Sequence, residues 1–429
     1  MSYQPLDDQS VITYLQQTAP QVGRLASQIG IDNALHAREV GDGNLNQVFI
    51  VTVGSQDSPS ATIIVKQALP YLRVSGEGWP LSRERMRFET QALLKYSELM
   101  PELVPEIYHH DLEMSLVVME YLDGFEVMRG PITKGQRFPN FAINIAEFTA
   151  RSHFFTSDAY LTSANKKAAQ AAFINPELCK LQEDFVFTNP FMTSPENNWN
   201  PLLEPDIIKL RGNATLKVTI NQTKYDYMTN AQAMLHGDLH TGSLMVQGDE
   251  LKIIDPEFAF YGPQAYDVGT LLANIVLGAA SQVHHTPDEA ARQDYQAYLL
   301  DLIEPIWQHY AQTFDRLWQD HTAAGTGGDL SPASYWEFAG GAEAFTSYRH
   351  NYLQDVLAST ARHGGCELLR RLMGIVSVAE LSSIPDDNIR VIAERQVLDI
   401  ASEWLSVPVT SINMLADAAR HVILDVSDT

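Results

Sequence analysis

Two short segments in the middle of the chain constrain its chemistry more than any other feature. Residues 235–243 read LHGDLHTGS, and residues 253–257 read IIDPE. A turn that carries one aspartate, followed by an apolar run that ends in a second aspartate, suits phosphoryl transfer. The first carboxylate orients the acceptor hydroxyl, and the second holds the metal ion on the nucleotide. The two segments therefore predict a phosphotransferase that uses ATP and Mg²⁺.

The composition indicates the class of protein. With 429 residues, 45% of them hydrophobic, the chain can build a large core, and its length favours two lobes. The formal net charge of −24 disfavours nucleic acid and anionic membranes as partners. Two cysteines suit a reducing compartment, residues 1–10 do not read as a signal peptide, and no apolar run reaches about 18 residues. We therefore expect a cytoplasmic protein.

A glycine-bearing turn opens the first predicted β-hairpin. Residues 41–46 read GDGNLN, and two strand-like runs follow. Taken alone, Gly41 and Gly43 more often mark a tight turn than a phosphate site. Together with Asn44 and Asn46, they lie where a kinase loop brings backbone N–H groups close to phosphate oxygens. The turn is therefore a candidate nucleotide site.

A lysine and a glutamate are expected to bind near this turn. Lys66 ends the apolar run 63–65, where a lysine considered alone is usually solvated. In a hairpin next to the glycine turn, it would instead neutralise the nucleotide phosphates as a point charge. A following helix, expected over about residues 82–98, should supply its carboxylate partner. We prefer Glu89 to Glu84, because Glu89 lies deeper in the apolar pattern.

The apolar run that ends in Glu120, Tyr121 and Leu122 would connect the two lobes. A purine needs one backbone donor and one backbone acceptor from such a segment, between apolar walls. An ordinary buried edge strand would have a similar sequence. These three residues are candidate adenine contacts through their backbone.

The candidate chemistry depends on three carboxylates. Asp238 is placed to orient the acceptor hydroxyl and take its proton. Ser243 stands five residues later, where many kinases use asparagine to bind metal, and a hydroxyl is a poorer ligand. Asp255 and Glu257 are separated by one residue in a turn, so both can face one cation. Their oxygens suit Mg²⁺, which also takes phosphate oxygens and water.

The sequence alone does not assign two arginines and a histidine to the chemistry. Arg370 and Arg371 are adjacent in a helix-like segment, and neighbours i and i+1 do not share a helix face. Considered alone, one or both are expected at the surface. His240 is expected to orient the turn that follows Asp238 rather than to act as a catalyst.

Taken together, these motifs closely resemble the methylthioribose kinase family. The DPE sequence, with Ser243 in place of asparagine, is far more specific than HGD, which many small-molecule kinases share. The matching motifs lie between about residue 41 and residue 380, so the resemblance covers most of the chain. They are 41–46 (GDGNLN), 66–70 (KQALP), 79–80 (WP), 236–243 (HGDLHTGS), 255–263 (DPEFAFYGP) and 369–371 (LRR).

The resemblance implies an α+β, two-lobed, protein-kinase-like fold of the aminoglycoside phosphotransferase type. Residues 1–120 would form a small N-terminal lobe with an antiparallel β-sheet, and residues 121–429 a larger, mainly α-helical C-terminal lobe. It implies ATP-dependent phosphorylation of the 1-hydroxyl of 5-methylthioribose in methionine salvage, by a homodimer. The loop that bears Trp79 would lie over the substrate and exclude water, whose attack would waste ATP.

The same resemblance assigns roles to individual residues. Asp238 would be the base that meets the substrate, and Asp255 and Glu257 would hold Mg²⁺. The family's arginine pair maps onto Arg370 and Arg371, which would contact the substrate and stabilise the transferring phosphoryl group. This reverses the expectation for the two arginines considered alone.

Two other functions remain open. A kinase for another small alcohol, such as an aminoglycoside, choline or homoserine, would use the same catalytic residues. A polycationic aminoglycoside would need an acidic cleft, and arginines near the site argue against a cationic substrate. A non-catalytic, kinase-like nucleotide-binding module predicts the loss of Lys66, Asp238 or Asp255, and all three are present.

Overall fold

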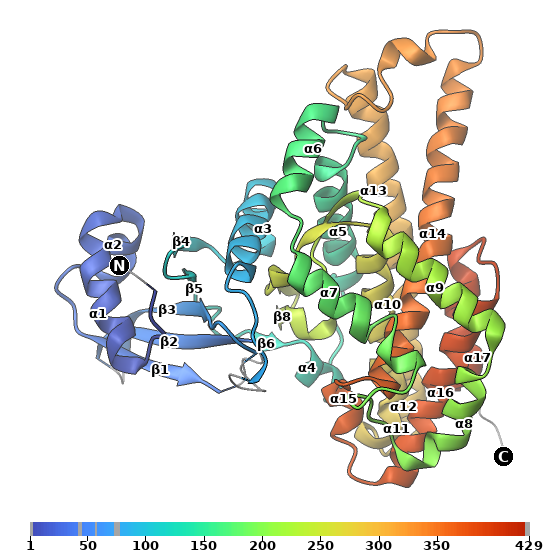
Figure 1. Cartoon of the computed structure of the whole chain (residues 1–429), viewed down its shortest axis with the longest axis horizontal. Coiled ribbons are helices and arrows are strands. Elements are labelled where there is room, and N and C mark those ends of the chain that lie inside the picture. The colour runs from blue at the N-terminus through green and yellow to red at the C-terminus, as the bar shows by residue number, and fades with distance from the viewer. Residues whose placement is uncertain (1–2, 42–44, 56–57, 73–77, 425–429) are drawn as a thin grey trace. The chain divides into compact units, whose positions relative to one another are not determined.

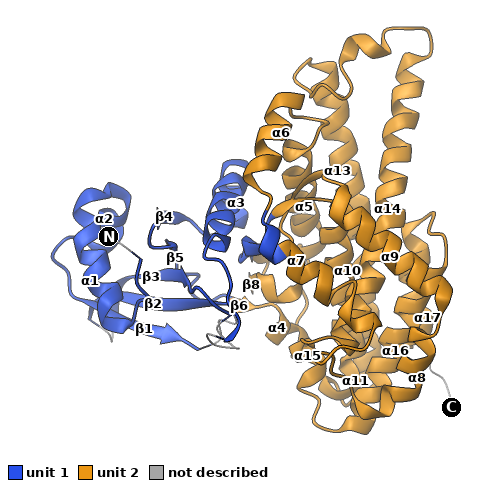
Figure 2. Ribbon diagram, in the orientation of Figure 1, with its two compact units in different colours: residues 1–125, 175–178, 252–259 blue, residues 126–174, 179–251, 260–429 orange. Residues whose placement is uncertain are grey.

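The computed structural model describes residues 3–41, 45–55, 58–72 and 78–424. It divides into two compact units (Figure 2). Unit 1 comprises Met1–Phe125, Asn175–Leu178 and Lys252–Ala259, and unit 2 comprises Glu126–Ile174, Cys179–Leu251 and Phe260–Thr429. The boundary expected after residue 120 lies near the first change of unit. A single boundary does not describe Lys252–Ala259, which groups with unit 1 although it follows much of unit 2 in the sequence.

Unit 1 is built on one antiparallel sheet with the strand order β1-β2-β3-β5-β4. Side chains alternate between its faces, so Phe49, Val51 and Val53 of β2 are all fully buried on one of them. That face packs with α1 and α2 in the hydrophobic core of the unit. The elements are α1 Asp8–Thr18, α2 Gly23–Ile29, β1 Leu35–Val40, β2 Asn46–Ser55, β3 Ser58–Ala68, α3 Arg85–Leu99, β4 Ile107–Asp111 and β5 Leu116–Glu120.

The sheet and α3 position the first group of candidate site residues. Lys66 lies opposite Val48 of β2 and Val117 of β5, so it projects from a strand paired on both sides. Helix α3 packs against the short 3₁₀ helix η7, Pro256–Phe258. This packing brings the helix that carries Glu89 to the DPE segment.

Unit 2 is mostly helical (Figure 1). Its long helices α13 and α14 extend together beyond its other helices and are joined at their far ends (Figure 1). Its strands are short: β6 Glu126–Val127, β7 Ala233–Leu235, β8 Leu244–Gln247 and β10 Phe260–Gly262, while β9 Glu250–Ile253 spans the change of unit. Its helices are α4 Arg129–Thr133, α5 Phe141–Thr156, α6 Ser163–Ala172, α8 Glu204–Arg211, α9 Ala214–Thr229, α10 Gln264–Ala280, α11 Gln282–His285, α12 Glu289–Leu300, α13 Ile303–Ala323, α14 Gly341–Met373, α15 Ala379–Ser382, α16 Asp387–Ser406 and α17 Ile412–Leu424, and α7 Pro176–Phe185 also spans a change of unit.

The core of unit 2 centres on the packing of α10 against α14. Every residue of α10 is buried. The two helices approach closely at Gly269, where an added Cβ would lie 2.7 Å from the backbone nitrogen of Gly364 and 2.7 Å from the carbonyl oxygen of Thr360. This contact fixes the start of α10 relative to the last turns of α14, which carry the arginine pair.

The observed fold agrees with the expected class. An antiparallel N-terminal sheet and a mainly helical remainder confirm the α+β prediction. Among the described residues, no helix is both long and apolar enough to cross a membrane.

The glycine contact between α10 and α14 gives a stability prediction. Gly269→Ala should lower the free energy of unfolding by about 1–3 kcal/mol, because the new methyl group meets backbone atoms that cannot rotate away. Thermal and urea unfolding measure the change. Gly130→Ala is the control, since it is also helical but has no atom within 4 Å of an added Cβ. Equal unfolding midpoints for the two variants would contradict the close packing.

Candidate active site

Lys66 lies between two carboxylates of unit 1. Its Nζ lies 2.8 Å from Glu89 Oε1 and also pairs with Asp255 Oδ1. Lys66 and Glu89 are buried, whereas 45% of the Asp255 side chain is exposed. Glu84, the competing candidate, is exposed and pairs with Arg87. Buried Glu89 thus compensates the charge of Lys66, while its second partner, Asp255, remains accessible to solvent.

Asp255 has an unusual backbone conformation. Its φ of 68° and ψ of 40° are left-handed, a region that residues other than glycine rarely adopt. Such a conformation costs about 1–3 kcal/mol and persists only where the surroundings impose it. Asp255 lies between β9 and η7, and in this conformation its carboxylate reaches Lys66.

Glu257 is held by a polar network inside unit 1. Its Oε2 accepts a hydrogen bond from Asn46 Nδ2 at 2.8 Å, and Arg85 Nε lies 3.7 Å away. Arg85 Nε also donates to Asn46 Oδ1 at 3.0 Å. Burial raises the pKa of Glu257, and Glu89 raises it further, against the opposite effects of Lys66, Arg85 and Asn46. Burial thus outweighs the stabilising effect of the cations in this network, and the pKa of Glu257 lies above its usual value.

The donor set fits Mg²⁺ that arrives with a nucleotide. Mg²⁺ takes hard oxygen ligands and is commonly held by one or two carboxylates together with phosphates and water. Asp255 and Glu257 supply two carboxylates, and the raised pKa of Glu257 is an effect that a nearby cation would reverse. The described residues contain no group of three or more metal-ligating side chains. Asp255 and Glu257 could hold a Mg²⁺ ion whose remaining ligands are phosphate oxygens and water.

The other expected nucleotide contacts are only partly described. Gly43 and Asn44 lie outside the described residues, and Gly41 is an exposed turn residue directly after β1. Trp79 is half-buried, and its carbonyl oxygen accepts a hydrogen bond from Leu72 N–H at 2.9 Å.

The segment from Glu120 to Leu122 begins at the last residue of β5 and is well hydrogen-bonded. Glu120 N–H donates to the carbonyl of Glu106 at 2.8 Å, and Glu120 Oε2 accepts from Glu106 N–H at 3.1 Å. The carbonyl of Tyr121 accepts from Asp123 at 3.0 Å, and that of Leu122 from Phe125 at 3.2 Å. The segment is therefore a fixed turn.

In unit 2, a buried aspartate fixes the backbone of the HGD turn. The Asp267 carboxylate, in the first turn of α10, accepts hydrogen bonds from His236 N–H at 2.7 Å and Gly237 N–H at 2.9 Å. Gly237 adopts a φ of 81°, which glycine tolerates best. Ser243 Oγ donates to the Asp238 carbonyl at 2.9 Å, so its hydroxyl also stabilises the turn.

The Asp238 side chain lies among cationic and N–H groups. Its Oδ2 is 3.2 Å from His240 Nε2, and its Oδ1 is 3.6 Å from Arg370 Nη2. Burial alone would raise the pKa of Asp238. The interactions with His240, and the charges of Arg370 and Arg371, lower the pKa of Asp238 well below its usual value. Asp238 is therefore an anion throughout the neutral pH range.

Arg370 and Arg371 share one buried partner. Arg370 Nε lies 2.5 Å from Glu367 Oε2, and Arg371 Nε lies 2.8 Å from Glu367 Oε1. Although the arginines are adjacent, they stand three and four residues after Glu367, and both spacings place side chains together on a helix. Burial raises the pKa of Glu367, but the opposite effect of the two arginines is larger. The pKa of Glu367 is therefore lowered to about 2. The expectation from spacing alone, that one or both arginines lie at the surface, is wrong.

A third arginine lies next to the same turn. An added Cβ at Gly242 would lie 2.8 Å from Arg129 Cζ and 2.8 Å from His240 Cε1, so both side chains flank this glycine. Arg129 Nε is 3.7 Å from Glu380 Oε2, and Glu380 Oε1 accepts a hydrogen bond from Thr241 at 3.0 Å. Side chains from α4 and α15 thus contact the turn.

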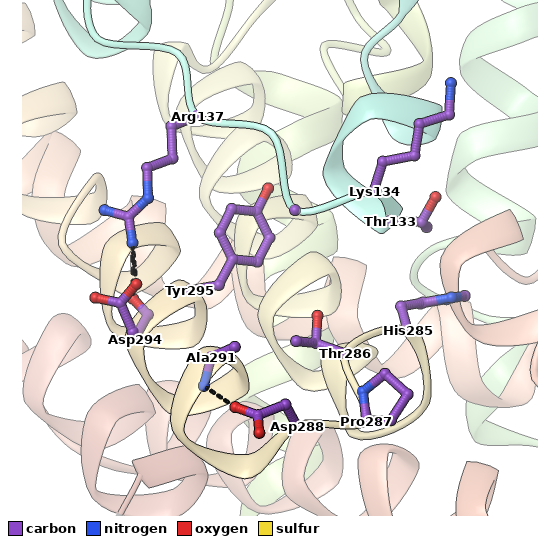
Figure 3. Close-up of a pocket in the computed structure, with 11 residues that line it drawn as sticks. Thr133, Lys134, Arg137, His285, Thr286, Pro287, Asp288, Ala291, Asp294 and Tyr295 are labelled. Atoms are coloured by element: carbon purple, nitrogen blue, oxygen red, sulfur yellow. Dashed lines mark hydrogen bonds and ion pairs between the residues drawn. The ribbon is translucent and has the colours of Figure 1, made fainter.

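A separate cavity of unit 2 contains none of the predicted site residues. It has a volume of about 380 Å³ and lies between the end of α4 and helices α11 and α12 (Figure 3). Its charged side chains already have partners: Arg137 pairs with Asp294 at 2.5 Å, and Asp288 accepts a hydrogen bond from Ala291 N–H at 2.8 Å. This cavity offers no set of groups for phosphoryl transfer.

Comparison with known proteins identifies the family. The phosphotransferase enzyme family matches residues 36–313. Methylthioribose kinase 1 of Oryza sativa subsp. japonica is 37% identical over 406 residues, covering 94% of this chain and 91% of the relative. The chain belongs to the methylthioribose kinase family.

Two other methylthioribose kinases agree with this assignment. Methylthioribose kinases of Bacillus cereus (strain 03BB102) and Escherichia coli O45:K1 are 37% and 38% identical, and cover 86% and 88% of this chain and the same shares of their own lengths. A Plasmodium vivax ethanolamine kinase of known structure gives a TM-score of 0.43 at 14% identity, covering 91% of this chain and 89% of its own.

The sequence did not predict several side chains that contact the candidate site residues. Glu367 could have been found, because its spacing to both arginines is a helical signal. Arg85, Arg129 and Glu380 act through contacts distant in sequence, for which no local pattern exists. Asp267 likewise meets the HGD turn from a separate helix.

Removing the shared partner of the arginines should destabilise the kinase. Glu367→Ala removes the closest carboxylate partner of two largely buried cations and should lower the free energy of unfolding by about 3–5 kcal/mol. Urea unfolding monitored by circular dichroism measures this. Glu343→Ala, an exposed glutamate in the first turn of the same helix, should change it by less than about 1 kcal/mol. Similar values for the two variants would show that Glu367 does not balance the arginine charges.

Proposed function

We propose that this kinase transfers the γ-phosphoryl group of ATP to the 1-hydroxyl of 5-methylthioribose, forming 5-methylthioribose 1-phosphate in methionine salvage. The observation that carries the proposal is the Asp238 carboxylate flanked by His240 and Arg370. Two arginines at this point disfavour a cationic acceptor such as choline or an aminoglycoside. They suit a neutral sugar that becomes anionic on reaction. The names of the relatives support the same substrate.

The proposed reaction assigns a role to each group near Asp238. The carboxylate orients the sugar hydroxyl and accepts its proton as the new bond to phosphorus forms. Arg370 and Arg371 contact the substrate and stabilise the negative charge of the transferring phosphoryl group. Their shared bond to Glu367 limits the positions that they can adopt, so little reorganisation is needed during reaction.

The proposed nucleotide site uses the residues of unit 1. Lys66, held by Glu89, would neutralise phosphate charge once the nucleotide competes for it. Asp255 and Glu257 would hold Mg²⁺, which neutralises charge on the phosphates. The backbone contacts to phosphate and adenine come, in this proposal, from Gly41, Gly43, Asn44, Asn46, Glu120, Tyr121 and Leu122. Trp79 would exclude water from the bound substrate.

We also propose that the kinase acts as a homodimer in the cytoplasm. The support is its membership of the methylthioribose kinase family, together with two cysteines that are free in the described residues. Sedimentation equilibrium tests the assembly directly, since a mass equal to one chain at micromolar concentration would contradict it.

A panel of acceptors tests the proposed substrate. Wild-type protein should consume ATP with 5-methylthioribose and not with ribose, homoserine, choline or kanamycin, in a coupled assay for ADP. Turnover confined to another alcohol would retain the phosphotransferase chemistry and reject 5-methylthioribose as its substrate.

Asp238→Asn tests the base. It should lower kcat by about 10²-fold or more, because the amide cannot accept the proton, while the Kd for ATP changes little. Coupled assay and calorimetry give the two values. Asp249→Asn, at an exposed turn after β8, is the control and should match the wild type. Near-normal turnover by Asp238→Asn would remove Asp238 from this role.

Glu257→Ala tests the metal ligand. Ser243 donates its hydroxyl to the turn and cannot replace the lost carboxylate, so the Mg²⁺ concentration for half-maximal activity should rise by about tenfold or more. Titration of activity with Mg²⁺ at saturating ATP measures this. The control is Glu250→Ala, an exposed glutamate at the start of β9. An unchanged Mg²⁺ titration would exclude Glu257 as a ligand.

A further inference from the structure

The two ring nitrogens of His240 contact different partners. Nδ1 accepts a hydrogen bond from Gly242 N–H at 3.0 Å and lies 3.3 Å from Ser243 Oγ, while Nε2 lies 3.2 Å from Asp238 Oδ2. A backbone N–H can only donate, so Nδ1 must be unprotonated. The proton of the neutral imidazole is then on Nε2. The turn itself therefore selects the tautomer that directs an N–H at Asp238.

Burial favours this neutral form. Burial lowers the pKa of His240, and the charges of Arg129 and Arg371 lower it further, while Asp238 raises it. The net pKa of His240 lies below its usual value. The charged groups around the ring thus come from its own turn (Asp238), from α4 (Arg129) and from α14 (Arg371), and two buried carboxylates, Glu380 and Glu367, hold the arginines.

We infer that His240 is a positioning residue for phosphoryl transfer, which donates from Nε2 to Asp238 Oδ2 and leaves Oδ1 to receive the acceptor proton. The inference rests on the proposed function of Asp238 as base. As the acceptor oxygen bonds to the γ-phosphorus, the bond from that phosphorus to the β–γ bridging oxygen breaks and ADP leaves. The acceptor proton passes to Asp238 Oδ1, while the Nε2 proton stays on His240. The histidine neither gains nor loses a proton.

A purely structural role would depend on the other nitrogen. Through Nδ1, His240 caps the 3₁₀ helix η6, Thr241–Ser243. The two roles can be separated by substitution, because asparagine can place an acceptor oxygen near the Nδ1 position, and glutamine can place an amide N–H near the Nε2 position. His240→Asn keeps the cap and loses the donor to Asp238. His240→Gln keeps the donor and weakens the cap.

Comparison of the two variants tests the inference. His240→Gln should keep kcat within about tenfold of the wild type, although its melting temperature falls. His240→Asn should keep its melting temperature but lose about 10²-fold in kcat, with an unchanged KM for ATP. Its acid limb of kcat/KM should move to higher pH, since loss of the donor raises the pKa of Asp238. His350→Asn, at an exposed position of α14, is the control. An Asn variant at least as active as the Gln variant overturns the inference.

A spectroscopic measurement keeps the test independent of the substrate. Long-range ¹H–¹⁵N spectra of histidine-labelled protein report the protonation of each ring nitrogen, and the His240 signals are those missing from His240→Gln. We expect a neutral ring protonated on Nε2 at about pH 8. A ring protonated on Nδ1, or a charged ring, overturns the inference. If wild-type protein phosphorylates none of the tested alcohols, the proposed function fails, while the tautomer is still measured.

Discussion

The candidate acceptor site depends on the compensation of buried charge by Glu367. This carboxylate is fully buried on α14. It pairs with both Arg370 and Arg371, because they follow it by three and four residues on the helix. Both arginines lower the pKa of Asp238, and Arg371 also lowers the pKa of His240. Without Glu367, the two cations would repel each other and lose their fixed geometry. Helix α10, which packs against α14, also positions the HGD turn, because Asp267 of α10 accepts hydrogen bonds from its backbone N–H groups.

Unit 1 contains a second cluster of charged side chains. Three buried or half-buried carboxylates, Glu89, Asp255 and Glu257, meet the cations of Lys66 and Arg85. The raised pKa of Glu257 shows that burial outweighs the available positive charge. A magnesium nucleotide would bring Mg²⁺ to the carboxylates and phosphate oxygens to Lys66. Each of these groups would then have a partner of opposite charge. The left-handed backbone at Asp255 is consistent with strain maintained for such a site.

The sequence predicted features that depend on local spacing. The position of Lys66 at the end of a strand, and the depth of Glu89 in the apolar pattern, were sufficient to predict their pairing, and the structure joins them. The prediction failed for Arg370 and Arg371 considered alone, because it compared the arginines with each other and not with Glu367. Contacts between distant segments carry no local signal: Asn46 meets Glu257 across 211 residues, and Thr241 meets Glu380 across 139. The contacts of the Asn46 side chain with Glu257 and Arg85 were not predicted, and its backbone contact with phosphate stays a prediction.

The most direct test of this account is a crystal structure with Mg²⁺, a non-hydrolysable ATP analogue and 5-methylthioribose. We expect Mg²⁺ within about 2.0–2.2 Å of oxygens from both Asp255 and Glu257, with Lys66 on a phosphate. The 1-hydroxyl of the sugar should lie within about 2.6–3.2 Å of Asp238 Oδ1, and His240 should remain on Oδ2. A sugar bound away from Asp238, or a metal ion without contact to Glu257, would contradict the account.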